Sequence, residues 1–402
     1  MNRCDDQAIR TRDLFHNISR VPSTRLILLA ALILSLPVAA EDGPGDQIVL
    51  VTAKHEDQQE QIEGRIIAQA QDGGLILEDQ GGRYRQLTPD QIVDRKETST
   101  PFEYLQGNAQ SDDLSRFVGK GFRPFETDHY LIVSDSSEVY SEFCGRLLER
   151  VHDEFYEFFG DRGVELKPLP ARLPVVVLSS PAEFMEFARS RHPETQFQET
   201  TPGFYSVRDN QIMIQDLAGD SSIRTISSMR RKLATQPRQV STIVHEAVHQ
   251  LAFNSGLQVR FADNPVWFSE GLALYFEPIS GSSALLWATP GQVNDLHLKN
   301  LQMQTGNGQL QLPINELLQS DVVFTSPEKI AAAYAESWAL FSYLERRHSD
   351  ELTRYCQILM QRKPLKTVTP DERLEEFRGI MEKSTDEIES RMVPYFRRMR
   401  VR

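Results

Sequence analysis

The feature that most constrains this chain is a pair of histidines four residues apart, His245 and His249. Apolar residues recur around them at helical spacing, and Gly256 follows the pattern, which predicts a helix that ends just before it. Residues four apart lie on one face of a helix, so both imidazoles can reach the same ion. The spacing therefore predicts two zinc ligands on one helix, and the alternative is a pair of ordinary surface or core histidines.

The residue after the first histidine is Glu246. It is rotated from His245 by about 100° around the helix, so its carboxylate would lie beside a bound ion rather than on it. A carboxylate in that place accepts a proton from the attacking water in metal-dependent hydrolysis. We predict Glu246 as the general base, and the alternative is an inert helix carboxylate.

A catalytic zinc site has three protein ligands and an open fourth position, so a third ligand is required. A second helix is predicted from Val266 to Phe276, and it carries Glu270 about one turn inside its start. Glu270 is the best candidate for the third ligand, although it could also be a solvated helix glutamate. Asp263 and Glu277 are poorer candidates by position. Gly271 is expected to let the two helices approach closely.

The run Pro-x-Trp-Phe-x-Glu-Gly-Leu-Ala-x-Tyr-Phe-Glu, from Pro265 to Glu277, together with the two histidines, resembles the gluzincin zinc metallopeptidases. Within them it is similar to bacterial peptidase-MA-like proteins, many of which are classed as domains of unknown function. The resemblance implies an HExxH helix completed by a glutamate on a following helix. A metzincin would instead have glycine and histidine where Ala252 and Ser255 stand.

An apolar run from Leu26 to Ala40 follows Arg20 and Arg25 and ends in Val38-Ala39-Ala40. This pattern is typical of a signal peptide over residues 1–40 and predicts secretion or export to the periplasm. The alternative is an uncleaved N-terminal membrane anchor, because the leader before the run is long. The run itself is short for a membrane span, and no other segment is long enough, so no stable span is expected after processing.

The net charge is −13, and removal of residues 1–40, with five arginines and three aspartates, would make it −15. A balance this acidic opposes nucleic-acid binding. Only Cys144 and Cys356 would then remain, which permits one disulfide without establishing it. The sequence does not indicate an oligomeric state.

The predicted fold class is α+β, with a small β-barrel similar to an SH3 fold over residues 41–98. Four short runs with strand composition and tight glycine turns between them support the barrel: Ile48–Val51, Gly64–Ala68, Leu75–Leu77 and Tyr84–Leu87. A polar stretch over residues 99–121 is predicted to be a linker with a short helix. The barrel's ligand cannot be inferred from its sequence.

Residues 122–402 are predicted to form a gluzincin-like domain with a mixed sheet and a mainly helical C-terminal half. Strands over Tyr130–Val133 and Leu173–Leu178 flank a long helix from Ser137 to Phe159. Residues 203–214 are predicted to form a hairpin just ahead of the zinc helix. In gluzincins such a strand edge binds extended substrate by strand addition, and the resemblance makes this hairpin the candidate.

Tyr334 begins a helical run that includes Trp338 and Phe341. Related enzymes supply a tyrosine or histidine that stabilises the oxyanion from the side opposite the base, and Tyr334 resembles that tyrosine in lying well downstream of the third ligand. A tyrosine that only packs in the core is the equal alternative, and His297 is a weaker competitor for the same role.

Together these features predict a zinc peptidase in which His245, His249 and Glu270 hold Zn²⁺, Glu246 is the base, and a peptide or protein is the substrate. Two other classes stay open. One is a non-catalytic peptidase-like protein that binds a cell-wall or surface ligand, and the other is a zinc amidase on a non-peptide substrate, since water activation does not select its carbonyl.

Overall fold

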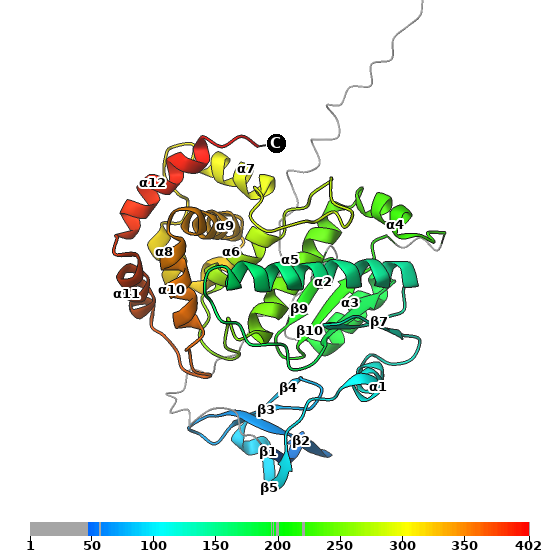
Figure 1. The fold of residues 1–402 in the computed structure, drawn as a ribbon. Helices are drawn as coiled ribbons and strands as arrows, with labels where there is room; N and C mark the ends of the chain where they lie inside the picture. The colour runs from blue at the N-terminus through cyan, green and yellow to red at the C-terminus, as the bar shows by residue number, and fades with distance from the viewer. Residues whose placement is uncertain are drawn as a thin grey trace, which may run out of the picture.

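The computed structural model describes residues 47–55, 58–193, 195, 197, 201–218 and 222–401. Within these residues the chain forms twelve α-helices and two open five-stranded sheets, a mixed α+β architecture (Figure 1). The predicted signal peptide lies outside the described residues. No helix in the described part is long and apolar enough to cross a membrane.

The N-terminal sheet has the order β4-β3-β2-β1-β5, and every neighbouring pair is antiparallel. Its strands are β1 (Gln47–His55), β2 (Gln58–Gln69), β3 (Leu75–Glu78), β4 (Tyr84–Leu87) and β5 (Ile92–Pro101). The four predicted strands are confirmed. As described, the sheet ends at β4 on one side and β5 on the other, so it is open, and the closed barrel stays a prediction.

The strand of this sheet that the sequence did not predict is β5 (Ile92–Pro101). Most of its side chains are exposed and polar, so its sequence lacks the alternation that marks a half-buried strand. Its backbone nevertheless pairs with β1 over most of its length. Because backbone hydrogen bonds do not depend on side-chain type, a polar strand can complete a sheet without a hydrophobic pattern. The following polar stretch contains α1 (Gly107–Val118).

The second sheet has the order β6-β7-β8-β10-β9 and is mixed, as predicted. Its strands are β6 (Arg123–Glu126), β7 (Tyr130–Ser134), β8 (Leu173–Leu178), β9 (Gly203–Ser206) and β10 (Gln211–Gln215). The central strands β7, β8 and β10 are parallel, whereas β6 and β9 pair antiparallel at the two ends. The predicted hairpin is thus confirmed as β9 and β10, with β9 at the edge of the sheet.

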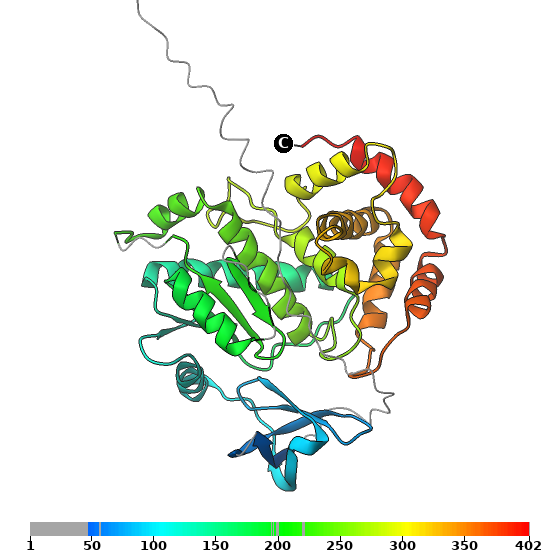
Figure 2. The same ribbon diagram turned by 180° about the vertical axis from the view of Figure 1, so that it is seen from behind.

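Helices cover both faces of this sheet (Figures 1 and 2). Alternate residues of β8, Val175 and Val177, belong to the large core that also contains α2 (Glu138–Gly160) and α5 (Pro237–Asn254). Val176, between them, packs instead with α1 and α3 (Pro181–Arg191) in a smaller core. The two-residue repeat of a strand therefore divides one apolar run between two layers of helices.

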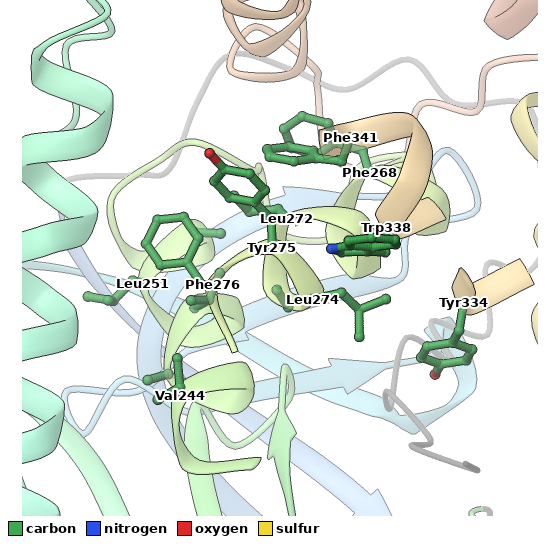
Figure 3. Packing of buried hydrophobic residues seen from close by; sticks show 14 of the residues in the cluster. Val244, Leu251, Phe268, Leu272, Leu274, Tyr275, Phe276, Tyr334, Trp338 and Phe341 are labelled. Carbon is green, nitrogen blue, oxygen red and sulfur yellow. The ribbon is translucent and has the colours of Figure 1, made fainter. Parts of the chain in front are cut away.

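After β10, every regular element of the described residues is a helix, as predicted for the C-terminal half. Besides α5 and one short 3₁₀ turn (Asp321–Phe324), these are α4 (Ile226–Leu233), α6 (Val266–Phe276), α7 (Asp295–Gln304), α8 (Ile314–Gln319), α9 (Ile330–Arg347), α10 (Ser349–Leu359), α11 (Pro370–Met381) and α12 (Thr385–Arg397). Side chains of α5, α6 and α9 meet in the core, where Phe341 lies beside Phe268 (Figure 3).

The close approach at Gly271 joins α6 to α9. A Cβ added at Gly271 would lie 2.7 Å from the carbonyl oxygen of Ser337 and 2.9 Å from Cβ of Phe341. The prediction that this glycine allows close helix packing is confirmed, but its neighbour is α9 and not the helix that carries the histidines. The sequence does not identify the neighbour, because α9 begins more than fifty residues later.

Gly271→Ala is expected to lower the free energy of unfolding by about 1–3 kcal/mol, since the new methyl group forces two helix backbones apart. Chemical denaturation of the variant beside wild type measures this change. Gly379→Ala in α11 is the matched control, because a Cβ there meets nothing within 4 Å. Equal stability of Gly271→Ala and wild type would contradict the predicted close contact.

Candidate metal centre

The first helix of the site, α5, is enclosed on nearly all sides. It packs against α2, α6 and the strands β9 and β10, and almost every residue from Gln239 to Phe253 is buried. A helix that is buried all round is held by its neighbours rather than by one apolar face. Pro237 occupies its first turn, where the missing N–H costs nothing, and Gly256 follows it with φ of 77°.

The second helix, α6, has the predicted bounds, and all of its residues except the first are buried. Pro265 is its N-cap, and the carboxylate of Asp321 accepts a hydrogen bond from the backbone N–H of Val266. This contact satisfies one of the unpaired donors at the start of the helix. The helix thereby carries Glu270, whose side chain is fully buried, into the space beside α5.

The three predicted ligands meet in one buried cluster. Nε2 of His245 lies 3.1 Å from Nε2 of His249 and 3.3 Å from Oε2 of Glu270. One ligand atom from each residue lies within 4.8 Å of the other two. His245 and Glu270 have no exposed surface, and His249 is 1% exposed. The structure thus places the predicted residues of two separate helices around a single point.

The cluster fits a zinc ion by its donor set and its spacing. Two imidazole nitrogens and one carboxylate oxygen are the donors found in catalytic zinc sites. Two ligand atoms each about 2.1 Å from a tetrahedral ion lie about 3.4 Å apart, close to the separations of 3.1 and 3.3 Å in this cluster. A buried carboxylate also needs compensating positive charge, which a divalent ion supplies.

Glu277 contacts the cluster from outside. Its Oε2 lies 3.0 Å from Nδ1 of His245, and its Oε1 accepts a hydrogen bond of 2.9 Å from the side-chain amide of Asn294. An ionised carboxylate only accepts hydrogen bonds, so Nδ1 of His245 carries the proton and Nε2 presents its lone pair to the cluster. Glu277 therefore orients His245 as carboxylates commonly orient metal-binding histidines.

The sequence relates Glu277 to Glu270, although it predicts Glu277 only as a poorer ligand candidate. Glu277 follows Glu270 by seven residues, which is about two turns, so both carboxylates project from nearly the same side of α6. The spacing indicates a shared side of the helix, but it does not tell a ligand from a residue that supports a ligand.

Glu277→Ala is expected to weaken zinc binding about 10- to 100-fold, because His245 loses the partner that fixes its proton and its ring. Glu277→Gln should lose less, since the amide oxygen still accepts from Nδ1. Competition with a chelator of known affinity measures both variants. Wild-type zinc affinity in Glu277→Ala would show that His245 does not depend on this contact.

Glu246 faces the edge strand of the mixed sheet. Its Oε2 accepts a hydrogen bond of 2.9 Å from the backbone N–H of Tyr205 in β9, and the side chain is 4% exposed. The carboxylate of the predicted base is therefore held by a backbone group next to the ligand cluster. The sequence did not indicate this contact, since it joins residues 41 positions apart.

Tyr334 is buried on α9, and its ring packs edge-to-face on Phe324 at 5.7 Å. Figure 3 draws it apart from the aromatic side chains around Trp338. Its helix packs against α6, which carries Glu270. His297 is also buried, on α7, which packs on the same helix α9. The role of either side chain as an oxyanion donor stays a prediction.

A second group of candidate ligands consists of His129, just before β7, with Glu149 and His152 of α2. The two imidazole rings are stacked 3.6 Å apart with an angle of 17° between their planes. Lone pairs of two parallel stacked rings run side by side and do not converge on one ion. This geometry favours ring packing, with Nδ1 of His129 paired to Glu149 at 2.7 Å.

Cys144 and Cys356 are both buried and unbonded to each other. Burial raises the pKa of Cys356 to about 12 and that of Cys144 further. Both thiols are therefore protonated at neutral pH and behave as small apolar side chains.

A family model described as "Protein of unknown function (DUF1570)" matches residues 239–366. The match covers less than half of the chain, and it contains the three clustered ligands and the adjacent Glu246. No curated protein matches the chain. The two helices of the candidate metal centre thus belong to a segment that recurs in other proteins and to which no activity is assigned.

Proposed function

We propose that this protein is a zinc-dependent peptidase of the gluzincin type. The observation that carries the proposal is the convergence of His245, His249 and Glu270 from two helices in a buried cluster, with Glu246 next to it. Zinc held there would polarise the scissile carbonyl and lower the pKa of an attacking water. The protein's own residues then bind the substrate, hold the base and move protons.

Glu246 is the general base of this proposal. It would accept a proton from the attacking water and later deliver it to the leaving amine. The N–H of Tyr205 supports this role because it fixes one carboxylate oxygen and so limits the rotation of the side chain. A base with a fixed orientation needs less rearrangement to reach the reacting water.

The substrate proposed here is an extended peptide that adds to β9. Tyr205 lies opposite Ile212 in the ladder, but its N–H donates to Glu246 and so points away from β10. The outer edge of β9 therefore faces the site. The Tyr205 N–H is held by Glu246, so a peptide would pair with the other outward backbone groups of this edge and bring its backbone next to the base. Backbone pairing would bind it with little dependence on side chains.

Tyr334 is proposed as the oxyanion donor. Its support is its burial on a helix that packs against α6. Tyr334→Phe should lower kcat about 100-fold or more with the thermal midpoint nearly unchanged, because only a hydroxyl is lost. An unchanged kcat would assign Tyr334 to the core alone.

The proposed setting is outside the cytoplasm, on the strength of the signal peptide pattern over residues 1–40. The N-terminal sheet is proposed to be a small barrel of SH3 type. A long central strand supports this, since β2 pairs with β1 through its first half and with β3 through its second, with a register shift near Ile66.

The test is hydrolysis of a mixed peptide library by the purified, zinc-loaded chain, with the products identified by mass spectrometry. New peptide termini in the wild-type reaction, absent from Glu246→Gln, are the expected result. Zinc binding without any cleavage would favour a peptidase-like binding protein. Cleavage of a non-peptide amide alone would favour an amidase.

A further inference from the structure

Arg260 lies in the loop between the two helices of the candidate metal centre and is 7% exposed. Its guanidinium donates to the hydroxyl of Tyr205 at 2.6 Å, to the carbonyl of Val207 at 3.2 Å and to the side-chain oxygen of Asn210 at 2.7 Å. All three acceptors belong to the β9–β10 hairpin. A planar fork that makes three hydrogen bonds to one hairpin fixes the position of that hairpin.

The hairpin is also tied to the end of α5. Asn210, at its turn, has φ of 54° and exchanges hydrogen bonds of 2.8 and 3.0 Å with the side chain of Asn254. The side-chain amide of Gln250 donates to the carbonyl of Asn210 at 3.0 Å. The ring of Tyr205 stacks on Phe253. The hairpin and the histidine helix are therefore joined by several contacts, and Arg260 binds two of the same hairpin residues, Tyr205 and Asn210.

The N-terminal sheet holds the other side of Arg260. The guanidinium lies 4.9 Å from the ring centre of Tyr84 in β4, and the backbone N–H of Tyr84 donates to the carbonyl of Arg208 at 2.7 Å. Phe261, with φ of 58°, packs edge-to-face on the same ring at 5.3 Å. Figures 1 and 2 both draw the β3–β4 side of this sheet next to the mixed sheet.

A buried guanidinium is costly unless its donors are satisfied, and an apolar side chain in its place would often be at least as stable. The arrangement of Arg260 instead gives fixed geometry, because its donors set where Tyr205 stands. Tyr205 in turn donates its backbone N–H to Glu246. The chain of contacts thus runs from Tyr84 through Arg260 and Tyr205 to the proposed base.

We propose that Arg260 is a positioning residue for Glu246, and that the N-terminal sheet completes the catalytic site by holding Arg260 with Tyr84. The catalytic part of this inference rests on the proposed peptidase function. The structural part does not, because the position of the Tyr205 amide can be measured without turnover. The N-terminal sheet is thereby assigned a part in the site itself, in addition to any ligand of its own.

Hydrogen–deuterium exchange of the Tyr205 amide in the full, resting chain is the first measurement. Arg260→Met should speed this exchange about tenfold or more, as local opening becomes easier. Tyr84→Leu should also speed the exchange. If Arg260→Met folds poorly, Tyr205→Phe replaces it, because it keeps the backbone N–H of residue 205 but removes an acceptor of Arg260. Unchanged exchange in the folded variants would overturn the inference.

Tyr104→Leu is the matched control for Tyr84→Leu. Both tyrosines donate to the same oxygen of Glu78, at 2.7 Å from Tyr84 and 2.9 Å from Tyr104, but the ring of Tyr104 lies over Arg65 instead of Arg260. The control should leave the exchange of the Tyr205 amide unchanged. Equal acceleration by both substitutions would mean that general loosening of the sheet, and not the contact with Arg260, is responsible, and would overturn the inference.

Kinetics of the zinc-loaded variants give the second measurement. Arg260→Met should lower kcat about tenfold, since the base is displaced. KM should change less, because the pairing of β9 with β10 still holds the strand in the sheet. Arg260→Lys should recover part of the loss in kcat. A loss confined to KM would overturn the positioning role. If the wild type hydrolyses no peptide, the peptidase proposal fails, and the exchange measurement still decides whether Arg260 and Tyr84 hold the Tyr205 amide.

Discussion

Glu246→Gln is expected to lose nearly all peptide hydrolysis and to keep its zinc. Glutamine has almost the same shape and can still accept a hydrogen bond from the Tyr205 N–H, but its amide cannot take a proton from water. General-base catalysis contributes about 10²- to 10⁴-fold to rate, so kcat should fall by that factor. The ligand cluster does not include Glu246, which is why zinc content should stay at the wild-type value.

Single-turnover kinetics and metal analysis on the same preparation measure both parts of this expectation. Glu186→Gln, the same chemical change at an exposed position of α3, is the control and should match wild type. Retained hydrolysis in Glu246→Gln would remove the base from the mechanism. Loss of zinc would instead place Glu246 among the ligands.

Glu270→Ala is expected to lose zinc altogether under conditions where wild type retains it. The side chain supplies the only carboxylate of the cluster and all of its negative charge. Loss of a residue that only supports a ligand, such as Glu277, weakens zinc binding about 10- to 100-fold. Loss of a ligand should therefore reduce zinc affinity by more than this, and by more than Glu277→Ala does. Equilibrium dialysis against a zinc buffer gives the affinities of the two variants side by side.

The same substitution should change the response of stability to metal. A ligand that binds only the folded state at 100 times its dissociation constant adds about 2.7 kcal/mol to the free energy of unfolding. Chelation should therefore lower the thermal midpoint of wild type and leave that of Glu270→Ala unaffected. A midpoint that falls equally in both proteins would show that zinc binds elsewhere.

The candidate cluster was predictable from the sequence because its ligands lie on two helices whose signals are local. Spacing placed His245 and His249 on one side of α5, and the bounds of α6 follow from the proline before it and its apolar content. The run Leu173–Leu178 was predicted correctly for the same reason, since a buried parallel strand is continuously apolar.

What the sequence did not predict depends on contacts between distant segments. The polar strand β5 has no hydrophobic pattern, and the neighbour of Gly271 is set by how α9 folds back. The contact of Glu246 with Tyr205 and the place of Arg260 between two sheets need the tertiary structure. Helical spacing related Glu277 to Glu270. Only the contact of Glu277 with Nδ1 of His245 shows that Glu277 supports a ligand instead of being one.

The most direct test of the proposed centre is the zinc content of the purified wild-type chain beside His249→Ala, after equal exposure to zinc and removal of loosely bound metal. Three protein ligands predict about one zinc per wild-type chain and almost none in the variant. A wild-type chain without zinc, or a variant that keeps as much zinc as wild type, would contradict a metal centre formed by His245, His249 and Glu270.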